Sequence, residues 1–214
     1  MKRLVLLTAV LFTAVSCTKF GKNITVKGKV LNPITGEGYE GITVQLIRHK
    51  HFQYEGGYRE LKHTTTNQNG EFEISAYYGG KVWVQAQSPA EYYQLGWLYE
   101  KEDKYYYMKT VDKGKVMNID CHLVPYGNYQ LKINNVNCGG GADTLIINQT
   151  NQIGTFLGVD WVITGCNGYV TALEKVPMGT VHTKYTVIRN GVSNTYTVDF
   201  EVKPNQDNIQ EINY

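Results

Sequence analysis

The sequence has 214 residues, and Lys2 and Arg3 are the only charged residues among the first sixteen. The other 198 residues carry 19 charges of each sign and are formally neutral. A neutral chain without basic clusters argues against nucleic acid as a partner, because phosphate binding draws its affinity from concentrated Lys and Arg. With 17 Tyr, 22 Gly and only 5 Pro, the composition favours folded β structure over a disordered tail.

Residues 1–16 are predicted to be a secretory signal peptide. Two basic residues precede the apolar run 4–14, which is too short to cross a hydrocarbon core of ~30 Å as a helix. The run ends in Ala14-Val15-Ser16-Cys17, which resembles the lipobox of bacterial lipoproteins. The alternative is a plain signal peptide in which Cys17 is incidental.

The lipobox resemblance implies that Cys17 is acylated and becomes the N-terminus. Residues 17–23 would then be a short tether that holds the protein on a membrane without a spanning helix. The expected location is the bacterial cell envelope, with a lipid anchor in the outer membrane. The periplasmic or surface face is left open.

From residue 24 onward, apolar side chains recur at every second position, which is the period of half-buried β-strands. Ile42, Val44 and Leu46, for example, alternate with Thr43, Gln45 and Ile47. No window shows a helical stripe. The other inward positions predicted in the first half are Ile24, Val26, Gly28, Val30, Phe72, Ile74, Ala76, Val82, Val84, Ala86, Met117, Ile119, Cys121 and Leu123.

The stretch Pro125–Asn128 is expected to interrupt this pattern and to mark a domain boundary near residue 125. Alternation resumes with Tyr129, Leu131 and Ile133. The chain ends in a hairpin whose turn is Asn190-Gly191, the preferred type I′ pair. Its alternating positions are Val181, Thr183, Tyr185 and Val187 before the turn and Tyr196, Val198, Phe200 and Val202 after it. The sequence therefore predicts an all-β protein with two consecutive antiparallel β-sandwich domains, residues 24–124 and 125–214.

Three blocks of the first half carry a family resemblance. They are Val26–Val30, then Thr35–Val44 with its glycines at 36 and 41, then Thr66–Phe72 with Asn69-Gly70. In this order they resemble the carboxypeptidase regulatory-like (transthyretin-like) domain, and the match covers residues 24–124. The resemblance implies a sandwich of about seven strands in an extracytoplasmic setting and no activity of its own. Residues 125–214 resemble no family in this way.

The cysteines beyond the lipobox differ in their surroundings. Cys138 and Cys166 both lie beside glycines, and two loop cysteines in an oxidising compartment are natural partners. We expect a structural disulfide between them, although spacing alone does not fix connectivity. Cys121 falls on the apolar side of its strand and is predicted to be a buried thiol.

The richest aromatic region of the chain offers a candidate binding surface. It comprises Tyr92, Tyr93, Trp97, Tyr99, Tyr105, Tyr106 and Tyr107, interleaved with the charged run 100–104. Exposed aromatic platforms beside polar groups suit sugar rings or extended peptides. The alternative is a hairpin whose tyrosines pack on a sheet and whose charged run is the solvated tip.

Two further motifs are weighed against simpler explanations. His49 and His51 would share one face of a strand and His63 could lie opposite, which allows a metal site, but exposed histidines are the commoner case. Gly36–Gly41 matches the dinucleotide pattern G-x-G-x-x-G, yet β-branched residues follow it where a helix is required. No cofactor, metal or catalytic residue is predicted.

The sequence thus favours a non-catalytic, membrane-anchored envelope lipoprotein that acts as an accessory, scaffold or interaction module. The expected partners are the membrane, through Cys17, and other envelope proteins or glycans, with no nucleic acid. The alternative is a glycan- or peptide-binding lipoprotein that uses the Tyr-rich region 92–107. A hydrolase with an unrecognised site is the third hypothesis.

Overall fold

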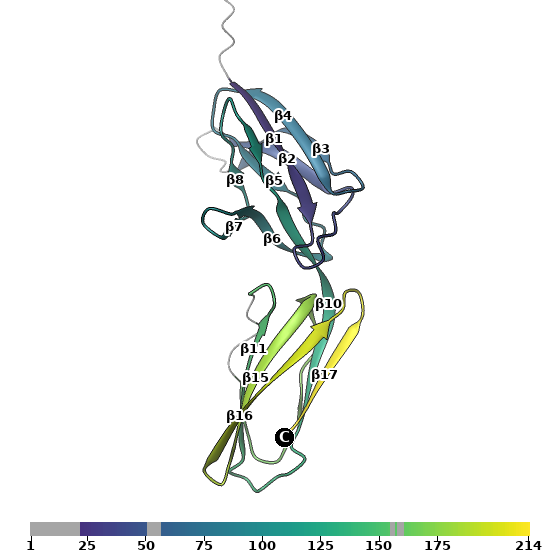
Figure 1. The fold of residues 1–214 in the computed structure, drawn as a ribbon, viewed down its shortest axis with the longest axis vertical. Helices are drawn as coiled ribbons and strands as arrows, with labels where there is room; N and C mark the ends of the chain where they lie inside the picture. Colours follow the sequence, from purple (N-terminus) through teal and green to yellow (C-terminus); the bar gives the residue numbers. More distant parts are fainter. Residues whose placement is uncertain (1–21, 51–56, 155–156, 158–160) are drawn as a thin grey trace, which may run out of the picture. The chain divides into compact units, whose positions relative to one another are not determined.

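The computed structural model describes residues 22–50, 57–154, 157 and 161–214, and every regular element in this part of the chain is a β-strand (Figure 1). The strands form two compact units. The first comprises the chain up to Val30, residues 39–87 and residues 97–121, and the second comprises residues 31–38, 88–96 and 122–214. No helix long and apolar enough to span a membrane occurs within the described ranges.

The first unit is a sandwich of short strands. They are β1 (Lys22–Leu31), β2 (Thr43–His49), β3 (Tyr58–Thr65), β4 (Glu71–Tyr78), β5 (Trp83–Ala86), β6 (Tyr92–Tyr99), β7 (Lys104–Tyr106), β8 (Lys109–Thr110) and β9 (Val116–Asn118). One sheet has the order β3-β2-β5-β8, and in the other β1 pairs with β4 on one side and β9 on the other. Only the first part of β6, up to Gly96, belongs to the second unit.

The core of the first unit follows the predicted alternation. Ile24, Val26, Val44 and Leu46 are fully buried. Ile47 was expected on the opposite, outer side, and this expectation is wrong because Ile47 is only 3% exposed. The pairing of β2 with β3 shifts register between Leu46 and Ile47, and simple alternation fails at such an irregularity.

Gly28 does not serve as an apolar inward residue in the way the alternation suggests. A Cβ atom here would lie 1.9 Å from the carbonyl oxygen of Ile119. The chain after β9 therefore runs tightly beside β1, where Ile119 N donates to Lys27 O at 3.0 Å. The side chain of Asp120 extends this contact by accepting from Lys29 N at 2.7 Å.

The second unit is also a two-layer sandwich. Its strands are β10 (Cys121–Asn134), β11 (Thr144–Asn151), β12 (Trp161–Thr164), β13 (Tyr169–Val170), β14 (Glu174–Pro177), β15 (Gly179–Arg189), β16 (Val192–Val202) and β17 (Asp207–Asn213). One sheet has the order β12-β11-β15-β16. In the other, β10 pairs with β13, β14 and β17.

The expected interruption at Pro125–Asn128 is wrong, because β10 continues through these residues as one strand. Pro125 lacks an N–H donor, but its carbonyl still accepts from Met178 N at 2.8 Å. The next residue, Tyr126, donates its N–H to Glu91 O at 3.0 Å. Pro125 therefore removes one backbone N–H donor from β10 but does not end the strand.

The predicted terminal hairpin is confirmed. β15 and β16 pair without a register shift from Arg189–Val192 to Gly179–Val202. Asn190 and Gly191 both have positive φ, 49° and 79°, as a type I′ turn requires.

Each unit contains a parallel pair of strands: β1 and β9 are the first and last strands of the first unit, and β10 and β17 are the first and last strands of the continuous segment 122–214 of the second. In the first unit β1 pairs with β9, and in the second β10 pairs with β17 over seven positions, from Asn128–Asp207 to Asn134–Asn213. Because each pair runs in one direction, the stretch from β1 to β9 starts at one end of its pair and finishes at the other, and so does the stretch from β10 to β17.

Candidate functional site

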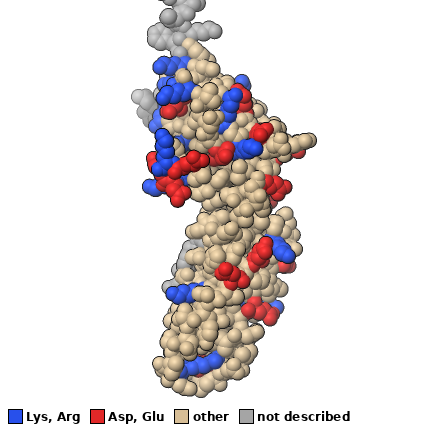
Figure 2. Space-filling view, viewed as in Figure 1, with Lys and Arg blue, Asp and Glu red and all other residues tan. Residues whose placement is uncertain are grey.

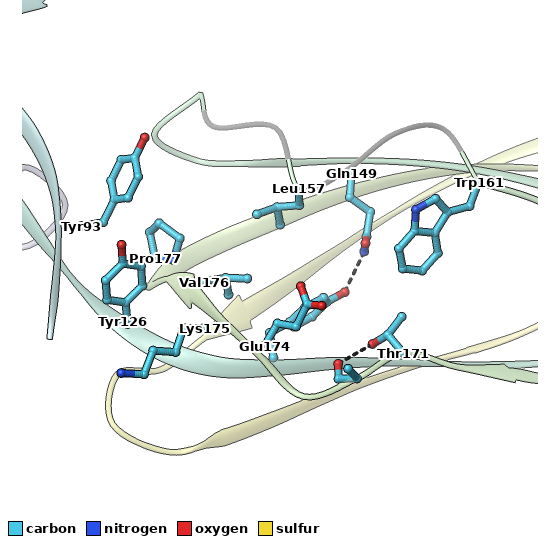
Figure 3. A pocket seen from close by; sticks show the side chains of 12 residues that line it. Tyr93, Tyr126, Gln149, Leu157, Trp161, Thr171, Glu174, Lys175, Val176 and Pro177 are labelled. Atoms are coloured by element: carbon cyan, nitrogen blue, oxygen red, sulfur yellow. Dashed lines mark hydrogen bonds between the residues drawn. The ribbon is translucent and has the colours of Figure 1, made fainter. Parts of the chain in front are cut away.

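A cleft of about 440 Å³ opens within the second unit (Figure 3). Its walls come from β10, β11, β12 and β14, together with Tyr93 of β6 and the segment before β14. Volumes of this order are typical of small-ligand sites. Figure 3 shows Tyr93 and Tyr126 at one end, Trp161 at the other, and Gln149 and Glu174 between them.

Aromatic rings form the two ends of this cleft. Tyr93 and Tyr126 meet edge to face, with ring centroids 6.2 Å apart. Trp161 meets Tyr169 in the same manner at 5.8 Å. Tyr93, Tyr126 and Trp161 are all partly buried, so their orientations are fixed while part of each ring surface stays accessible. Burial, and then the neighbouring Tyr93, raises the pKa of the Tyr126 hydroxyl.

The floor of the cleft leads into a buried polar cluster formed by Tyr129, Gln149, Thr183 and Gln210. The Tyr129 hydroxyl donates to Gln210 Oε1 at 2.5 Å and accepts from Gln149 Nε2 at 2.7 Å. Gln149 Nε2 also donates to Thr183 Oγ1 at 2.8 Å. Burial raises the pKa of Tyr129 to about 12, although the hydrogen bond from Gln149 acts in the opposite direction.

Charged groups line the rim of the cleft. Glu174 and Lys175, both on β14, are exposed. Neither takes part in an ion pair or side-chain hydrogen bond within the described residues, so both can serve a ligand. Thr171 is occupied, since its Oγ1 accepts from Leu131 N at 3.0 Å and donates to Ala172 O at 2.9 Å.

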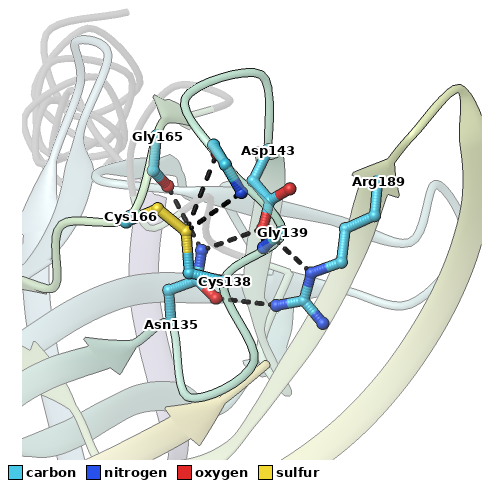
Figure 4. Close-up of a disulfide and its surroundings, with 8 residues drawn as sticks. Asn135, Cys138, Gly139, Asp143, Gly165, Cys166 and Arg189 are labelled. Atoms are coloured by element: carbon cyan, nitrogen blue, oxygen red, sulfur yellow. Dashed lines mark hydrogen bonds and ion pairs between the residues drawn. A yellow bond between two sulfur atoms is a disulfide. The ribbon is translucent and has the colours of Figure 1, made fainter.

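The predicted disulfide between Cys138 and Cys166 is confirmed (Figure 4). It joins the β10–β11 loop to the β12–β13 loop, 28 residues apart. The predicted buried thiol is also found, since Cys121 forms no disulfide and is fully buried.

A partly buried ion pair lies beside the disulfide. The Asp143 carboxylate is 2% exposed and accepts from Arg189 Nε and Gly139 N, both at 3.0 Å. Arg189 Nη2 also donates to Asn135 Oδ1 at 2.7 Å, and its guanidinium lies over the Tyr214 ring at 5.4 Å. The backbone bond from Gly139, with help from Asn135 and Arg189, lowers the pKa of Asp143. These contacts tie the disulfide loops to β15 and to the last residue of the chain.

The structure divides the Tyr-rich region between the two units. Tyr92 and Tyr93 belong to the second unit, and the other five aromatics belong to the first. The run 100–104 contains the turn between β6 and β7, as the hairpin alternative predicts. Trp97 is fully buried and packs edge to face on Phe72 at 5.8 Å, so it belongs to the core.

Two of the remaining aromatics of this region, Tyr99 and Tyr106, lie beside a cation. Lys109 Nζ lies 3.5 Å from the ring centroid of Tyr99 and 4.2 Å from that of Tyr106. Tyr99 also lines a depression of about 520 Å³ beside Met117. Tyr105 and Tyr107 are exposed. Of the seven predicted aromatics, only Tyr93 lines the cleft of the second unit.

The two described histidine candidates, His49 and His63, are not brought together. His49 packs against Tyr58 and Trp83, at 4.6 and 5.1 Å between ring centroids. His63 lies opposite Gln45 in the β2–β3 ladder, and its Nδ1 is 2.6 Å from Glu60 Oε1. Within the described ranges, no group of three or more His, Cys, Asp or Glu is placed to hold a metal ion.

Some predicted sites lie outside the described residues. These are the signal peptide, Cys17 with most of its tether, and His51. The G-x-G-x-x-G motif is described, and it falls between β1 and β2 with no helix following. Gly36 and Gly41 both have positive φ, 76° and 77°, as tight turns require.

Sequence reasoning missed Tyr126, Gln149, Trp161 and Glu174 as parts of one site. One signal was present, because Gln149 follows Leu145 and Ile147 at the inward positions of a strand. A polar residue in the core register of an alternating strand needs buried partners and marks a polar cluster or a site. The other residues come from distant strands, and no local pattern connects them.

No protein-family model matches this chain, and no curated protein matches it. Among solved structures, the Bacillus anthracis TIE protein is 15% identical at a TM-score of 0.35 over 90% of this chain, which spans 34% of that protein. The shaft pilin SpaA from Lactobacillus rhamnosus GG is 10% identical at 0.29, over 89% of this chain and 97% of the pilin. GBS52, the minor pilin of Streptococcus agalactiae, is 10% identical at a TM-score of 0.33, over 90% of this chain and 94% of the pilin. The β-sandwich fold is established by the sheets described above, and these distant likenesses add no function to it.

Proposed function

We propose that this protein is a non-catalytic, lipid-anchored component of the bacterial cell envelope that acts as a scaffold able to resist tension. Cys17 would carry the anchor in the outer membrane, and the two β-sandwich units would separate the membrane from a partner bound near the C-terminus. The parallel pairing of β1 with β9 and of β10 with β17 carries this proposal.

Parallel terminal strands determine how a pulled domain fails. When tension is applied between the entry to β10 and Tyr214, the ladder between β10 and β17 is loaded along the strands. The bonds of seven paired positions then share the load and have to break together. In a hairpin pulled at its open end, bonds break one at a time under lower force.

Side chains reinforce the β10–β17 ladder along its length. Asn128 Nδ2 donates to Asp207 Oδ1 at 2.8 Å at one end. Asn134 Nδ2 donates to Asn213 Oδ1 at 2.9 Å at the other. Between them Lys132 Nζ lies 3.6 Å from Glu211 Oε1. Each exposed pair is weak alone, but all three cross the one interface that would be sheared.

The first unit provides a further part of the proposal, a relationship to the carboxypeptidase regulatory-like domain. The first sequence block lies on β1, the second ends in β2, and the third leads into β4. All three strands contribute buried apolar side chains to the sandwich. Such domains commonly accompany other modules, which agrees with an accessory role.

Single-molecule pulling tests the scaffold proposal. The mature chain would be held at residue 17 and at Tyr214, and then in a second geometry at Thr180 and Glu201, which pulls the β15–β16 hairpin at its open end. We expect the second unit to resist clearly higher force in the first geometry. Reductant should increase the extension gained when the second unit unfolds by about 100 Å, because the 28-residue segment closed by the disulfide is released. Equal forces in the two geometries would refute the proposal.

The anchor needs a separate test. Cells grown with a labelled fatty acid should label the wild-type protein in the outer-membrane fraction. Cys17→Ser should abolish the label and release the protein from the membrane. A labelled Cys17→Ser variant, or an unlabelled wild type, would exclude lipidation at this residue.

A further inference from the structure

We infer that the cleft of the second unit binds one or two neutral sugar rings of a glycan. This inference assigns the cleft a ligand, and it stands independently of the mechanical role proposed above. It rests on three features of the cleft: its aromatic ends, its unused polar groups and the short strands at its border.

The aromatic ends present flat, preoriented surfaces to a ligand. Tyr126 is held by Tyr93, and Trp161 is held by Tyr169, in edge-to-face contacts at 6.2 and 5.8 Å. The aliphatic C–H face of a pyranose packs on such rings and loses little conformational entropy. Rings at both ends of a cleft of about 440 Å³ suit a flat, ring-shaped ligand better than a linear apolar chain.

The polar groups between the rings fit hydroxyls. The Gln149 side chain is anchored because its Nε2 donates to both Tyr129 and Thr183, and the residue is only 6% exposed. No hydrogen bond among the described residues uses Gln149 Oε1, so a nearly buried acceptor remains at the floor. The Glu174 carboxylate can accept from two neighbouring hydroxyls, and Lys175 can donate to ring or hydroxyl oxygens.

The border of the cleft disfavours an extended peptide. A peptide that binds by strand addition needs a long free edge with backbone donors and acceptors. The bordering strands β12 and β14 have four residues each, and β14 ends in Pro177, which has no N–H. On the face shown in Figure 2, charged side chains are sparse over the second unit, and Glu174 and Lys175 balance each other at the rim. These features favour an uncharged ligand.

Binding can be measured on the mature chain with soluble oligosaccharides of glucose, galactose, mannose and xylose. Tryptophan fluorescence provides the readout, since Trp161 lies in the cleft and the other two tryptophans, Trp83 and Trp97, lie in the first unit. We expect at least one oligosaccharide to change the fluorescence saturably, and Trp161→Phe to remove that change while calorimetry still detects binding.

Glu174→Gln is the decisive variant, because Glu174 is exposed and its replacement leaves the core intact. It should weaken binding about ten- to a hundredfold, the usual range for a lost hydrogen bond to a charged group. Glu201→Gln is the matched control, an exposed carboxylate on β16 of the same unit, and should bind as the wild type does.

Three outcomes would overturn the inference. One is the absence of saturable binding across the oligosaccharides at millimolar concentration. Another is binding that Glu174→Gln leaves unchanged. The last is saturable binding of an extended peptide, lost in Glu174→Gln, with no binding of any sugar.

Discussion

Replacing Tyr129 by Phe tests the buried polar cluster of the second unit. The hydroxyl donates to Gln210 Oε1 at 2.5 Å and accepts from Gln149 Nε2 at 2.7 Å. After its removal, Gln210 Oε1 keeps a longer bond from Thr183 at 3.3 Å, and Gln149 keeps its own bond to Thr183. Because neither partner is left without a bond, we expect Tyr129→Phe to lower the free energy of unfolding by about 1–2 kcal/mol at neutral pH.

The same substitution should reverse its effect in alkali. Burial raises the pKa of Tyr129 from 10.0 to about 12 in the folded state. The folded protein therefore holds this proton more tightly than the unfolded chain does. The resulting stability is complete below pH 10 and is lost as the pH rises from 10 to 12. It amounts to about 3 kcal/mol. The wild type should thus lose its advantage and become the less stable protein near pH 12.

Urea unfolding of both proteins at intervals between pH 8 and about pH 12 measures this crossover. Other tyrosines and the lysines also titrate in this range, but they are shared by both proteins and cancel in the difference. The exposed Tyr196→Phe controls for the loss of a hydroxyl in the same unit. The prediction is refuted if the difference in the free energy of unfolding between the wild type and Tyr129→Phe stays constant over this pH range. In that case, burial does not raise the pKa of Tyr129.

Three further predictions concern the second unit and are tested by equilibrium unfolding in urea. Replacing both cysteines of the disulfide by serine should cost about 3.5 kcal/mol, because the bridge closes a 28-residue segment, and reductant should have the same effect on the wild type but none on the variant. Gly127→Ala should cost about 1–3 kcal/mol, since its Cβ would lie 2.3 Å from the carbonyl oxygen of Lys203. Gly141→Ala, with no atom within 4 Å of its Cβ, should stay within about 0.5 kcal/mol, and an equal loss in both would contradict the close-approach argument. Leu131→Ala, at a fully buried position, should cost about 2–5 kcal/mol, and a loss below 1 kcal/mol would place Leu131 outside the core.

Local sequence signals predicted the strands well. The Asn190-Gly191 hairpin followed from two residues that tolerate positive φ between alternating runs. Leu131 and Ile133 were identified as core from their period alone and are fully buried. The disulfide followed from chemistry, because two glycine-flanked loop cysteines in an oxidising compartment are natural partners. These features depend on neighbours in the chain or on a single residue type.

Other features depended on distant partners and were missed. Pro125 looked like the end of a strand, but its carbonyl and the next N–H find partners more than thirty residues away. Val198 and Tyr196 continue the inward alternation of β16, yet they are 38% and 48% exposed, since a pattern does not reveal how far the opposite sheet extends. The cleft was missed for the same reason, as its residues come from five strands.

The parallel pairing of β10 with β17 also has a consequence for biogenesis. Its paired residues are 79 positions apart in sequence, so the ladder cannot close until residues 207–213 have been delivered to the folding compartment. Contacts of such long range are associated with slow folding. The second unit should therefore stay sensitive to proteases and chaperones during export until its final strand arrives, and a chain that loses residues 207–213 should fail to mature.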